Sequence, residues 1–540
     1  MSTIRLGLRV GRWGVLGFGA LAFVTTAVQA LAFYQVAGHT AAERATFAQS
    51  VAVLASHFTV VLPPPTRPDT VGGFVQYRGY GGLAILFAVW ALAAAAGAAR
   101  GDEERGVVEA VLATGVTRAS LLAARAAAFA IGALAAAAAA GAGLEVGAAS
   151  GGESIPVSSV LEAAAALAAL ALCCYCLTLL VAQLTAARLT AAVAGIVLLV
   201  LFLVNSLSRN LAWLVSVRWL SPFRYYELSR PLAPGGPFEV WATAVLLTAA
   251  ALACAAAALV FARRDLGSPA VRLSHAVHAA GYEPSRNPWW RIPVARGLYE
   301  RRAGFFAWMV GMMALGALFV ALTRSVVQPL LALPGLERFF TVFIRGELYS
   351  SFLGYIWFST AQLLFAAFAI VQVARWTSDE AEGRLELVLA TPRSRALVIV
   401  ERAAVLAVGA TLIALASWLA VAAAAGSQAI DVDRGRLIQA SLLLVPFTLF
   451  FAGLGSLLAA WIPRAAVGLL GGIAFASYLA DQVGALFKWP SWVQDLSAFR
   501  LFGTPLSDGI DRQGLALMVL IAIVGFGSSI LAMERRDVGS

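Results

Sequence analysis

One stretch of this sequence occurs twice. Residues 102–118 read DEERGVVEAVLATGVTR, and residues 379–395 read DEAEGRLELVLATPRSR. When the two stretches are extended to Gly132 and Gly409, 15 of 31 positions are identical at an offset of 277. Further matches follow at almost the same spacing: Arg188 and Arg464, LSPFR at 220–224 and LSAFR at 496–500, RRDLG at 263–267 and RRDVG at 535–539. The chain therefore contains an internal repeat, and its two halves are similar in sequence.

The composition places both halves in a lipid bilayer. Of 540 residues, 61% are hydrophobic and 13% are charged, and the mean hydropathy is +0.83. A soluble domain carries about 25% charged residues, and a membrane-spanning helix needs about 20 apolar residues. Twelve segments meet this need, at roughly 12–34, 81–99, 121–144, 156–184, 190–207, 238–262, 303–323, 350–374, 396–425, 437–462, 465–486 and 513–533. We expect an all-α membrane protein with twelve transmembrane helices.

The arginines indicate how these helices are oriented. Most of them lie in loops on the same side as the N-terminus, so that this side carries the whole net charge of +10. By the positive-inside rule this side is cytoplasmic, and with twelve spans both termini lie there. We expect two parallel six-helix repeats, at 1–267 and 296–540, joined by a cytoplasmic linker at 268–295. The abundance of arginine over lysine suggests a GC-rich bacterial genome, and we expect a multi-pass protein of the bacterial cytoplasmic membrane.

The duplicated segment lies on the cytoplasmic side, between the second and third spans of each half. In 379–391, Leu385, Val388 and Leu389 fall on one helical face, and Glu382 and Glu386 fall on another. This pattern predicts a short amphipathic helix parallel to the membrane in each half. Its charges could serve only to fix the topology. Because the same glycine, glutamate and arginine positions recur, we favour a shared contact with two equivalent partners.

The duplicated pattern, DEExGxxExxLAT followed by arginine, resembles the coupling-helix region of type-2 ABC exporter permeases. Within these, Asp69–Gly73, Trp219–Phe223 and the RRDLG motif resemble the two-repeat permeases of tetronasin-type polyketide antibiotic and multidrug exporters in high-GC Gram-positive bacteria. One departure is Gly115 in the first copy, where the second copy has Pro392, the commoner form in the family. The resemblance implies ATPase-coupling roles for Glu103, Gly106, Glu109, Thr114, Arg118, Glu380, Gly383, Glu386, Thr391, Pro392 and Arg395.

The chain itself has no motif for ATP hydrolysis. A P-loop requires a lysine followed by serine or threonine after a glycine-rich turn, and the sole lysine, Lys488, is followed by tryptophan. We therefore expect a transport subunit that is not an enzyme and binds no cofactor, with ATP and magnesium held by a separate ABC ATPase. Two coupling helices in one chain imply two copies of that ATPase. The dispersed basic charge gives no reason to expect nucleic-acid binding.

The resemblance also implies a type V ABC exporter fold, in which spans 2, 5, 8 and 11 surround the transport route. Aromatic and amide side chains on these spans suit an amphiphilic or lipophilic cargo, although ordinary helix packing explains them equally well. The candidates are Phe87, Trp90, Phe202, Asn205, Trp357, Phe358, Gln362, Phe365, Tyr478 and Gln482. Segments before spans six and twelve resemble short re-entrant helices that form an outer gate, with Pro222, Phe223 and Phe499 as candidates. They could also be plain connecting loops.

Other chemistry finds little support in the sequence. Cys173, Cys174 and Cys176 lack the paired spacing of a zinc site, and four histidines are too few for a hydrolytic triad that we could argue. We therefore expect no metal site. A proton-coupled drug antiporter of the major facilitator type also has two six-span halves, but residues 98–107 do not supply its characteristic loop. That antiporter is the main alternative to an ATP-driven exporter, and a non-transporting membrane scaffold is a third possibility.

Overall fold

The computed structural model describes residues 3–57, 63–209, 211–270, 289, 292–331, 348–391, 393–463, 465–484 and 487–535. The chain forms two compact units, Met1–Ala280 and Gly281–Ser540. The boundary between the units falls inside the linker that we expected at 268–295. All regular secondary structure in the described residues is helical.

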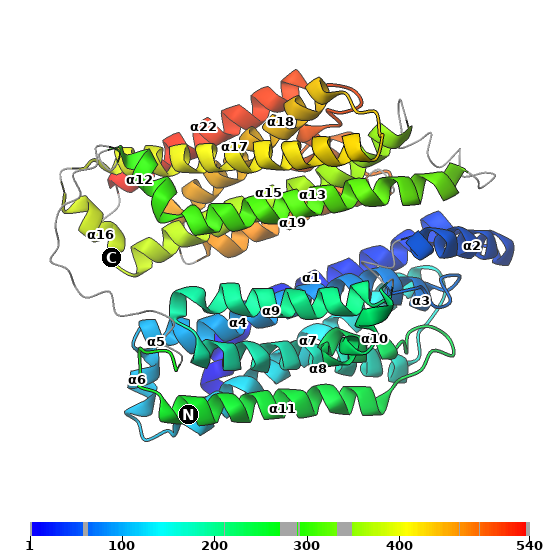
Figure 1. Cartoon of the computed structure of the whole chain (residues 1–540), viewed down its shortest axis with the longest axis horizontal. Helices are drawn as coiled ribbons and strands as arrows, with labels where there is room; N and C mark the ends of the chain where they lie inside the picture. Colours follow the sequence, from blue (N-terminus) through cyan, green and yellow to red (C-terminus); the bar gives the residue numbers. More distant parts are fainter. Residues whose placement is uncertain are drawn as a thin grey trace. The chain divides into compact units, whose positions relative to one another are not determined.

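The first unit consists of long helices joined by short helical segments (Figure 1). In chain order its helices are α1 (Thr3–Ala37), α2 (Ala41–His57), α3 (Val71–Val75), η1 (Gln76–Tyr80), α4 (Gly81–Ala96), η2 (Gly97–Gly101), α5 (Asp102–Glu104), α6 (Val107–Leu112), α7 (Arg118–Ser150), α8 (Val157–Leu184), α9 (Ala187–Leu207), η3 (Ala212–Leu214), η4 (Val217–Leu220), α10 (Pro222–Leu228) and α11 (Val240–Arg263). The segments η1 and η2 are π-helical turns, and they continue α3 and α4 into one long rod that ends at Glu104.

The described residues of the second unit repeat this order with fewer short segments. Its helices are α12 (Pro293–Glu300), α13 (Arg302–Leu331), α15 (Leu348–Ala381), α16 (Arg384–Leu389), α17 (Arg395–Ser427), α18 (Arg434–Trp461), α19 (Ala466–Gly484), α20 (Ser491–Gln494), α21 (Ala498–Phe502) and α22 (Arg512–Arg535). The helices α7 and α17, which follow the duplicated segment, are both 33 residues long.

Equivalent helices pack together in the two units. In the first unit α7 packs against α1 and α8, and α8 packs against α4 and α11; in the second unit α17 packs against α13 and α18, and α18 packs against α15 and α22. Each unit has its own hydrophobic core along these contacts. The sequence repeat is therefore also a repeat of helix packing.

Eleven helices in the described residues are long and apolar enough to cross a membrane. They are Thr3–Ala37, Val71–Glu104, Arg118–Ser150, Val157–Leu184, Leu189–Leu207, Val240–Arg263, Arg302–Ala321, Leu353–Ala381, Arg395–Ser427, Arg434–Trp461 and Arg512–Arg535. The remaining predicted span, 465–486, overlaps α19, and its last two residues lie outside the described residues. The all-α membrane architecture is confirmed, whereas the count of twelve and the cytoplasmic termini stay predictions.

Small residues allow α1 and α7 to approach closely. Gly143 and Gly147 form a GxxxG pattern on α7, and a Cβ atom at Gly143 would lie 2.1 Å from the Phe23 carbonyl oxygen. The Thr26 hydroxyl donates to the Ala140 carbonyl oxygen across this contact, at 2.7 Å. Close backbone approach through small residues is the usual way in which membrane helices associate, because burial from water no longer drives them together.

This crossing makes a testable prediction. Gly143→Ala should destabilise the protein by about 1–3 kcal/mol, because the new methyl group has no room and the two helices must separate. Gly17→Ala, on the same helix pair, meets no atom within 4 Å and should leave stability unchanged or raise it. Thermal unfolding of the purified protein in detergent measures both. Equal stability of the two variants would contradict the close crossing.

Candidate functional site

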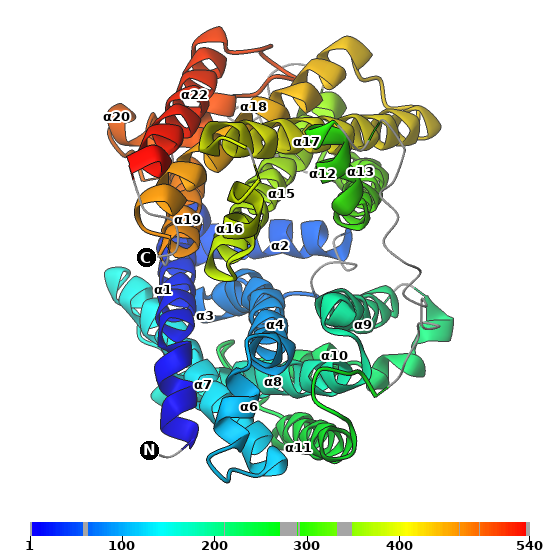
Figure 2. The same ribbon diagram turned by 90° about the vertical axis from the view of Figure 1, so that its left-hand side faces the viewer.

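The helices α6 and α16 form the core of the duplicated segment. Each begins directly after a glycine with a left-handed backbone, Gly106 at φ +71° and Gly383 at φ +70°. A side chain is strained in this conformation, so glycine is required where the chain turns sharply out of the preceding long helix. In Figure 2, which faces this end of the helices, α6 and α16 lie in front of their own unit's long helices. Both copies of the motif therefore fold alike.

The predicted amphipathic pattern is confirmed in both copies. Val108 and Leu385, at equivalent positions, are each only 2% exposed, whereas Glu109 and Glu386 are exposed. Thr114 and Thr391, which end these helices, are also exposed, and their hydroxyls donate to carbonyl oxygens three residues earlier. Each helix thus rests on its unit through an apolar face and presents a carboxylate outward. Pro392 lies outside the described residues.

Arg118 and Arg395 attach the next helix to the end of the same unit. Arg118 donates from Nη1 to the carbonyl oxygens of Phe261 and Arg264, both at 2.6 Å, at the end of α11. Arg395 donates in the same way to the carbonyl oxygen of Met533, near the end of α22. The matching arginines are therefore partly buried anchors between helices. In this structure they fix the position of α7 and α17, and a part in coupling stays a prediction.

One further ion pair in each unit joins the first residue of the duplicated segment to the long helix that follows the segment. Asp102 and Arg125 are 2.8 Å apart in the first unit, and Asp379 and Arg402 are 3.8 Å apart in the second. Both arginines lie one turn or more inside the helix that follows the motif, at the repeat offset of 277. Each amphipathic helix is therefore tied to the long helices on both sides of it.

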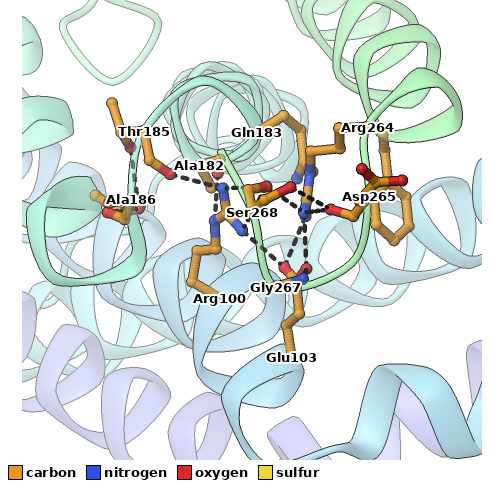
Figure 3. A network of polar contacts seen from close by, with 12 residues as sticks. Arg100, Glu103, Ala182, Gln183, Thr185, Ala186, Arg264, Asp265, Gly267 and Ser268 are labelled. Carbon is orange, nitrogen blue, oxygen red and sulfur yellow. Dashed lines mark hydrogen bonds and ion pairs between the residues drawn. The ribbon is translucent and has the colours of Figure 1, made fainter. Parts of the chain in front are cut away.

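Glu103 has an environment that the motif alone did not reveal. Its side chain is buried and lies at the centre of a polar network (Figure 3). Arg264 forms a two-point ion pair with its carboxylate at 2.6 and 2.7 Å, and Arg100 contacts it at 3.1 Å. The backbone N–H of Gly267 also donates to it, at 2.6 Å. Glu103 therefore serves internal partners in this structure, whereas Glu109 faces outward.

The two arginines of this network find further acceptors on α8. Arg100 donates to the carbonyl oxygens of Ala182 and Thr185, both at 2.7 Å, at the point where α8 ends. Arg264 donates from Nε to the Gln183 side chain at 2.9 Å. Two buried cations facing one carboxylate are tolerated only when such acceptors complete their hydrogen bonding. The network joins α5, α8 and the segment after α11 (Figure 3).

The start of the linker belongs to the same network. Arg264 donates to the carbonyl oxygen of Ser268 at 3.0 Å, and the Ala270 N–H donates to the Gln183 carbonyl oxygen at 3.1 Å. The chain that leaves the first unit is thereby held beside α5 for several residues.

The second unit has no equivalent of this buried network among its described residues. Thr377 occupies the position of Arg100, and its hydroxyl donates to the Ala374 carbonyl oxygen in its own helix. Glu380, which matches Glu103, is only half-buried. Arg384, next to Gly383, contacts Asp379 at 2.9 Å on the exposed side of the segment. This contact raises the pKa of the Arg384 guanidinium. The two copies of the duplicated segment share their fold but not their attachment.

Most of the candidate pathway residues are buried. Phe87 and Trp90 pack edge-to-face with ring centres 5.6 Å apart, and Trp357 packs against Phe319. Seven of the ten candidates are at most 7% exposed: Phe87, Trp90, Asn205, Trp357, Phe358, Gln362 and Phe365. Phe202, Tyr478 and Gln482 are half-buried. In this structure these side chains pack with neighbours, and their role in a route stays a prediction.

The gate candidates form a matched aromatic pair in each unit. Phe202 packs on Phe223 with ring centres 5.3 Å apart, and Tyr478 packs on Phe499 at 5.4 Å, both edge-to-face. These four residues match at an offset of 276. Pro222 begins the short helix α10 that carries Phe223. The short helices that we expected before the last span of each unit are therefore present, in contact with the fifth long helix of that unit.

A small cavity of about 50 Å³ lies beside the first of these pairs. Phe202, Phe223, Tyr226, Glu227 and Arg230 contribute to its wall. Sites for drug-sized ligands usually enclose about 300–1,000 Å³, so this cavity is too small to hold such a cargo in the present conformation.

The motif therefore identified Gly106, Glu109, Gly383 and Glu386 by pattern, but it did not identify Arg100, Arg125, Arg264 and Arg402 as partners. The repeat offset could have found Arg125 and Arg402, since both are arginine in each copy. Arg100 has no counterpart, so no repeat signal points to it. The cysteines are free, and no group of metal-binding side chains occurs among the residues that the structure describes.

The buried network makes a second prediction. Glu103→Gln should destabilise the protein by about 3 kcal/mol or more, because it leaves two buried guanidinium groups without a counter-charge. Glu380→Gln, the same change at the matching half-buried position, should cost less than about 1 kcal/mol. Thermal unfolding in detergent compares the two variants. An equal loss in both would mean that the two attachments are equivalent.

Comparison with known families covers nearly the whole chain. Residues 9–266 match the ABC-2 family transporter protein model, and residues 291–533 match the C-terminal domain of the multidrug efflux system permease Rv1217c. No curated protein matches the chain significantly. The two matched regions coincide with the two structural units, and each contains one copy of the duplicated segment. Residues 9–266 therefore form an ABC-2 family transporter domain, and residues 291–533 are similar to the C-terminal domain of a multidrug efflux permease, within one multi-pass membrane protein.

Proposed function

We propose that this chain is the transmembrane subunit of an ATP-driven exporter that moves amphiphilic or lipophilic compounds, such as antibiotics, out of the bacterial cell. ATP and magnesium would be bound by two copies of a separate ABC ATPase, one at α6 and one at α16. The observation that carries the proposal is the pair of matched helices, each buried on its apolar face and exposing one glutamate at the same position.

The attachments of these helices support a mechanical role. A partner that pulls on α6 displaces a segment joined to α7 through Asp102 and Arg125, and α7 is anchored to α11 through Arg118. Since the same connections recur in the second unit, force applied to either helix would reach the long helices of that unit. This is how ATPase closure would displace the long helices of each half and alter access to a transport route.

The cargo class rests on two kinds of support. One is the similarity of residues 291–533 to a multidrug efflux permease. The other is the abundance of aromatic side chains on the second and fifth long helices of each unit, which offer non-directional contact area to varied apolar molecules. The finer likeness to tetronasin-type exporters is part of this proposal. Nothing in the sequence or the fold favours the antiporter alternative over it.

The exposed glutamates provide the first test. Glu109→Ala combined with Glu386→Ala should abolish drug export and reduce the stimulation of ATP hydrolysis by the permease at least tenfold, while membrane insertion stays normal. Removal of two charge-assisted contacts, each of about 1.5–3 kcal/mol, accounts for an effect of this size. Efflux of a fluorescent amphiphile and ATPase activity in proteoliposomes measure the outcome.

Glu104→Ala is the matched control for this experiment. Glu104 is exposed on the same segment, but the second copy has Ala381 in its place, so it is no part of a shared contact. This variant should transport normally. Full activity in the double variant would refute the coupling assignment.

The number of ATPase copies provides a separate test. The purified complex should contain two ATPase subunits for each permease chain, because two coupling helices lie in one chain. Native mass spectrometry of the complex in detergent measures this ratio. A ratio of one to one, or two permease chains in each active complex, would contradict the proposal.

A further inference from the structure

The short helix α10 lies at the end of the first unit opposite α6 (Figure 1), and the sequence in and around α10 is rich in arginine. Four arginines occur within 22 residues, between the ends of α9 and α11: Arg209, Arg218, Arg224 and Arg230. Glu227 is the single acidic residue among them. Such an excess of positive charge on this side of a membrane protein runs against the usual distribution of arginine.

Two of these arginines contact the same tryptophan. The guanidinium carbon of Arg224 lies 5.0 Å from the ring centre of Trp219, and that of Arg218 lies 5.6 Å from it. Trp219 in turn packs against Tyr225 and Trp241, at 5.9 and 6.5 Å between ring centres. The aromatic group holds two cations close together in a partly buried place.

The acid in this region has other partners. Glu227 accepts hydrogen bonds from Asn205, at 2.8 Å, and from Arg209, with which it forms an ion pair. The Nε atoms of Arg218 and Arg224 are buried and have no hydrogen-bond partner among the residues that the structure describes. Burial, and then the charge of Arg218, lower the pKa of Arg224. Glu227 acts on Arg224 in the opposite direction, so the site holds more positive charge than this single carboxylate balances.

The second unit shows the same position in a neutralised form. Arg500 matches Arg224, but Asp495 stands in place of Trp219 and Gln494 in place of Arg218. The Nε atom of Arg500 lies 3.1 Å from Asp495 Oδ1, and Gln494 accepts a hydrogen bond from the same guanidinium. One repeat thus supplies its own anion at this place, and the other repeat replaces that anion with a second cation and an aromatic ring.

The neighbouring surface is apolar. Trp213 and Leu220 are 72% and 73% exposed, and Leu211, Val215 and Val217 are also exposed. Tryptophan and arginine side by side are typical of the boundary between hydrocarbon and headgroups, where rings enter the lipid and guanidinium groups contact phosphate. A soluble anion would not need this apolar surface.

We propose that Arg218, Trp219 and Arg224 form a binding site for the phosphate of an anionic phospholipid headgroup in the membrane leaflet at this end of the first unit. The two guanidinium groups contact the phosphate oxygens, since arginine matches their geometry with paired donors. The exposed side chains of 211–220 lie against the acyl chains of the same lipid layer. This site is independent of the coupling helices and of the cargo.

The test uses the full chain, delipidated in detergent and titrated with phosphatidylglycerol, with phosphatidylcholine or with inorganic phosphate. Native mass spectrometry counts retained lipids, and thermal unfolding reports stabilisation. Arg218→Gln with Arg224→Gln should bind phosphatidylglycerol about tenfold more weakly and lose one retained lipid, because two charged donors are removed. Arg500→Gln is the matched control and should retain the same lipids as the unaltered protein.

Phosphatidylcholine should be retained less than phosphatidylglycerol, and millimolar phosphate should not displace either. If the double glutamine variant does not fold, Arg218→Lys with Arg224→Lys keeps the charge and should lose part of the affinity only. Unchanged lipid retention in both double variants would overturn the proposal, as would an equal loss in Arg500→Gln. Displacement by inorganic phosphate would assign the site to a free anion and overturn the lipid as its occupant.

Discussion

The attachment of one arginine to the end of the last helix determines how each half of this protein holds its exposed segment. Arg118 in the first unit and Arg395 in the second donate to carbonyl oxygens that a helix C-terminus leaves unsatisfied. The bond closes each six-helix unit by joining its third long helix to its sixth. Because the short amphipathic helix directly precedes this arginine, it cannot move without the helices that the arginine connects.

The two halves then use different means to secure the other side of that segment. The first unit adds a buried ion-pair network around Glu103. In the described residues of the second unit, Asp379 contacts the exposed Arg384 at 2.9 Å and the mostly buried Arg402 at the longer distance of 3.8 Å. Buried charges resist displacement because a separated partner is left without solvent. Exposed pairs break and reform at little cost. The first segment is therefore the stiffer of two segments that otherwise have the same shape.

The sequence predicted the architecture well because the relevant signals are local or repeated. Hydropathy located the long helices, and the matched Gly106 and Gly383 located the turn before each short helix. Contacts between side chains far apart in the sequence could not be predicted. The contact of Arg100 with the end of α8 depends on a π-helical turn and on backbone carbonyl oxygens. Residue types do not predict either feature. The pathway side chains could not be assigned for a similar reason. An aromatic residue on a membrane-spanning helix either packs against neighbouring helices or faces a transport route, and the sequence is the same in both cases.

The difference between Arg100 and Thr377 has a consequence for the history of such a chain. In an assembly of two identical chains, every substitution appears in both subunits, so an arginine acquired by one is acquired by the other. Fusion of the two copies into a single polypeptide removes that restriction, and each copy is then free to diverge alone. The unmatched arginine is thus a difference that a pair of identical chains could not carry.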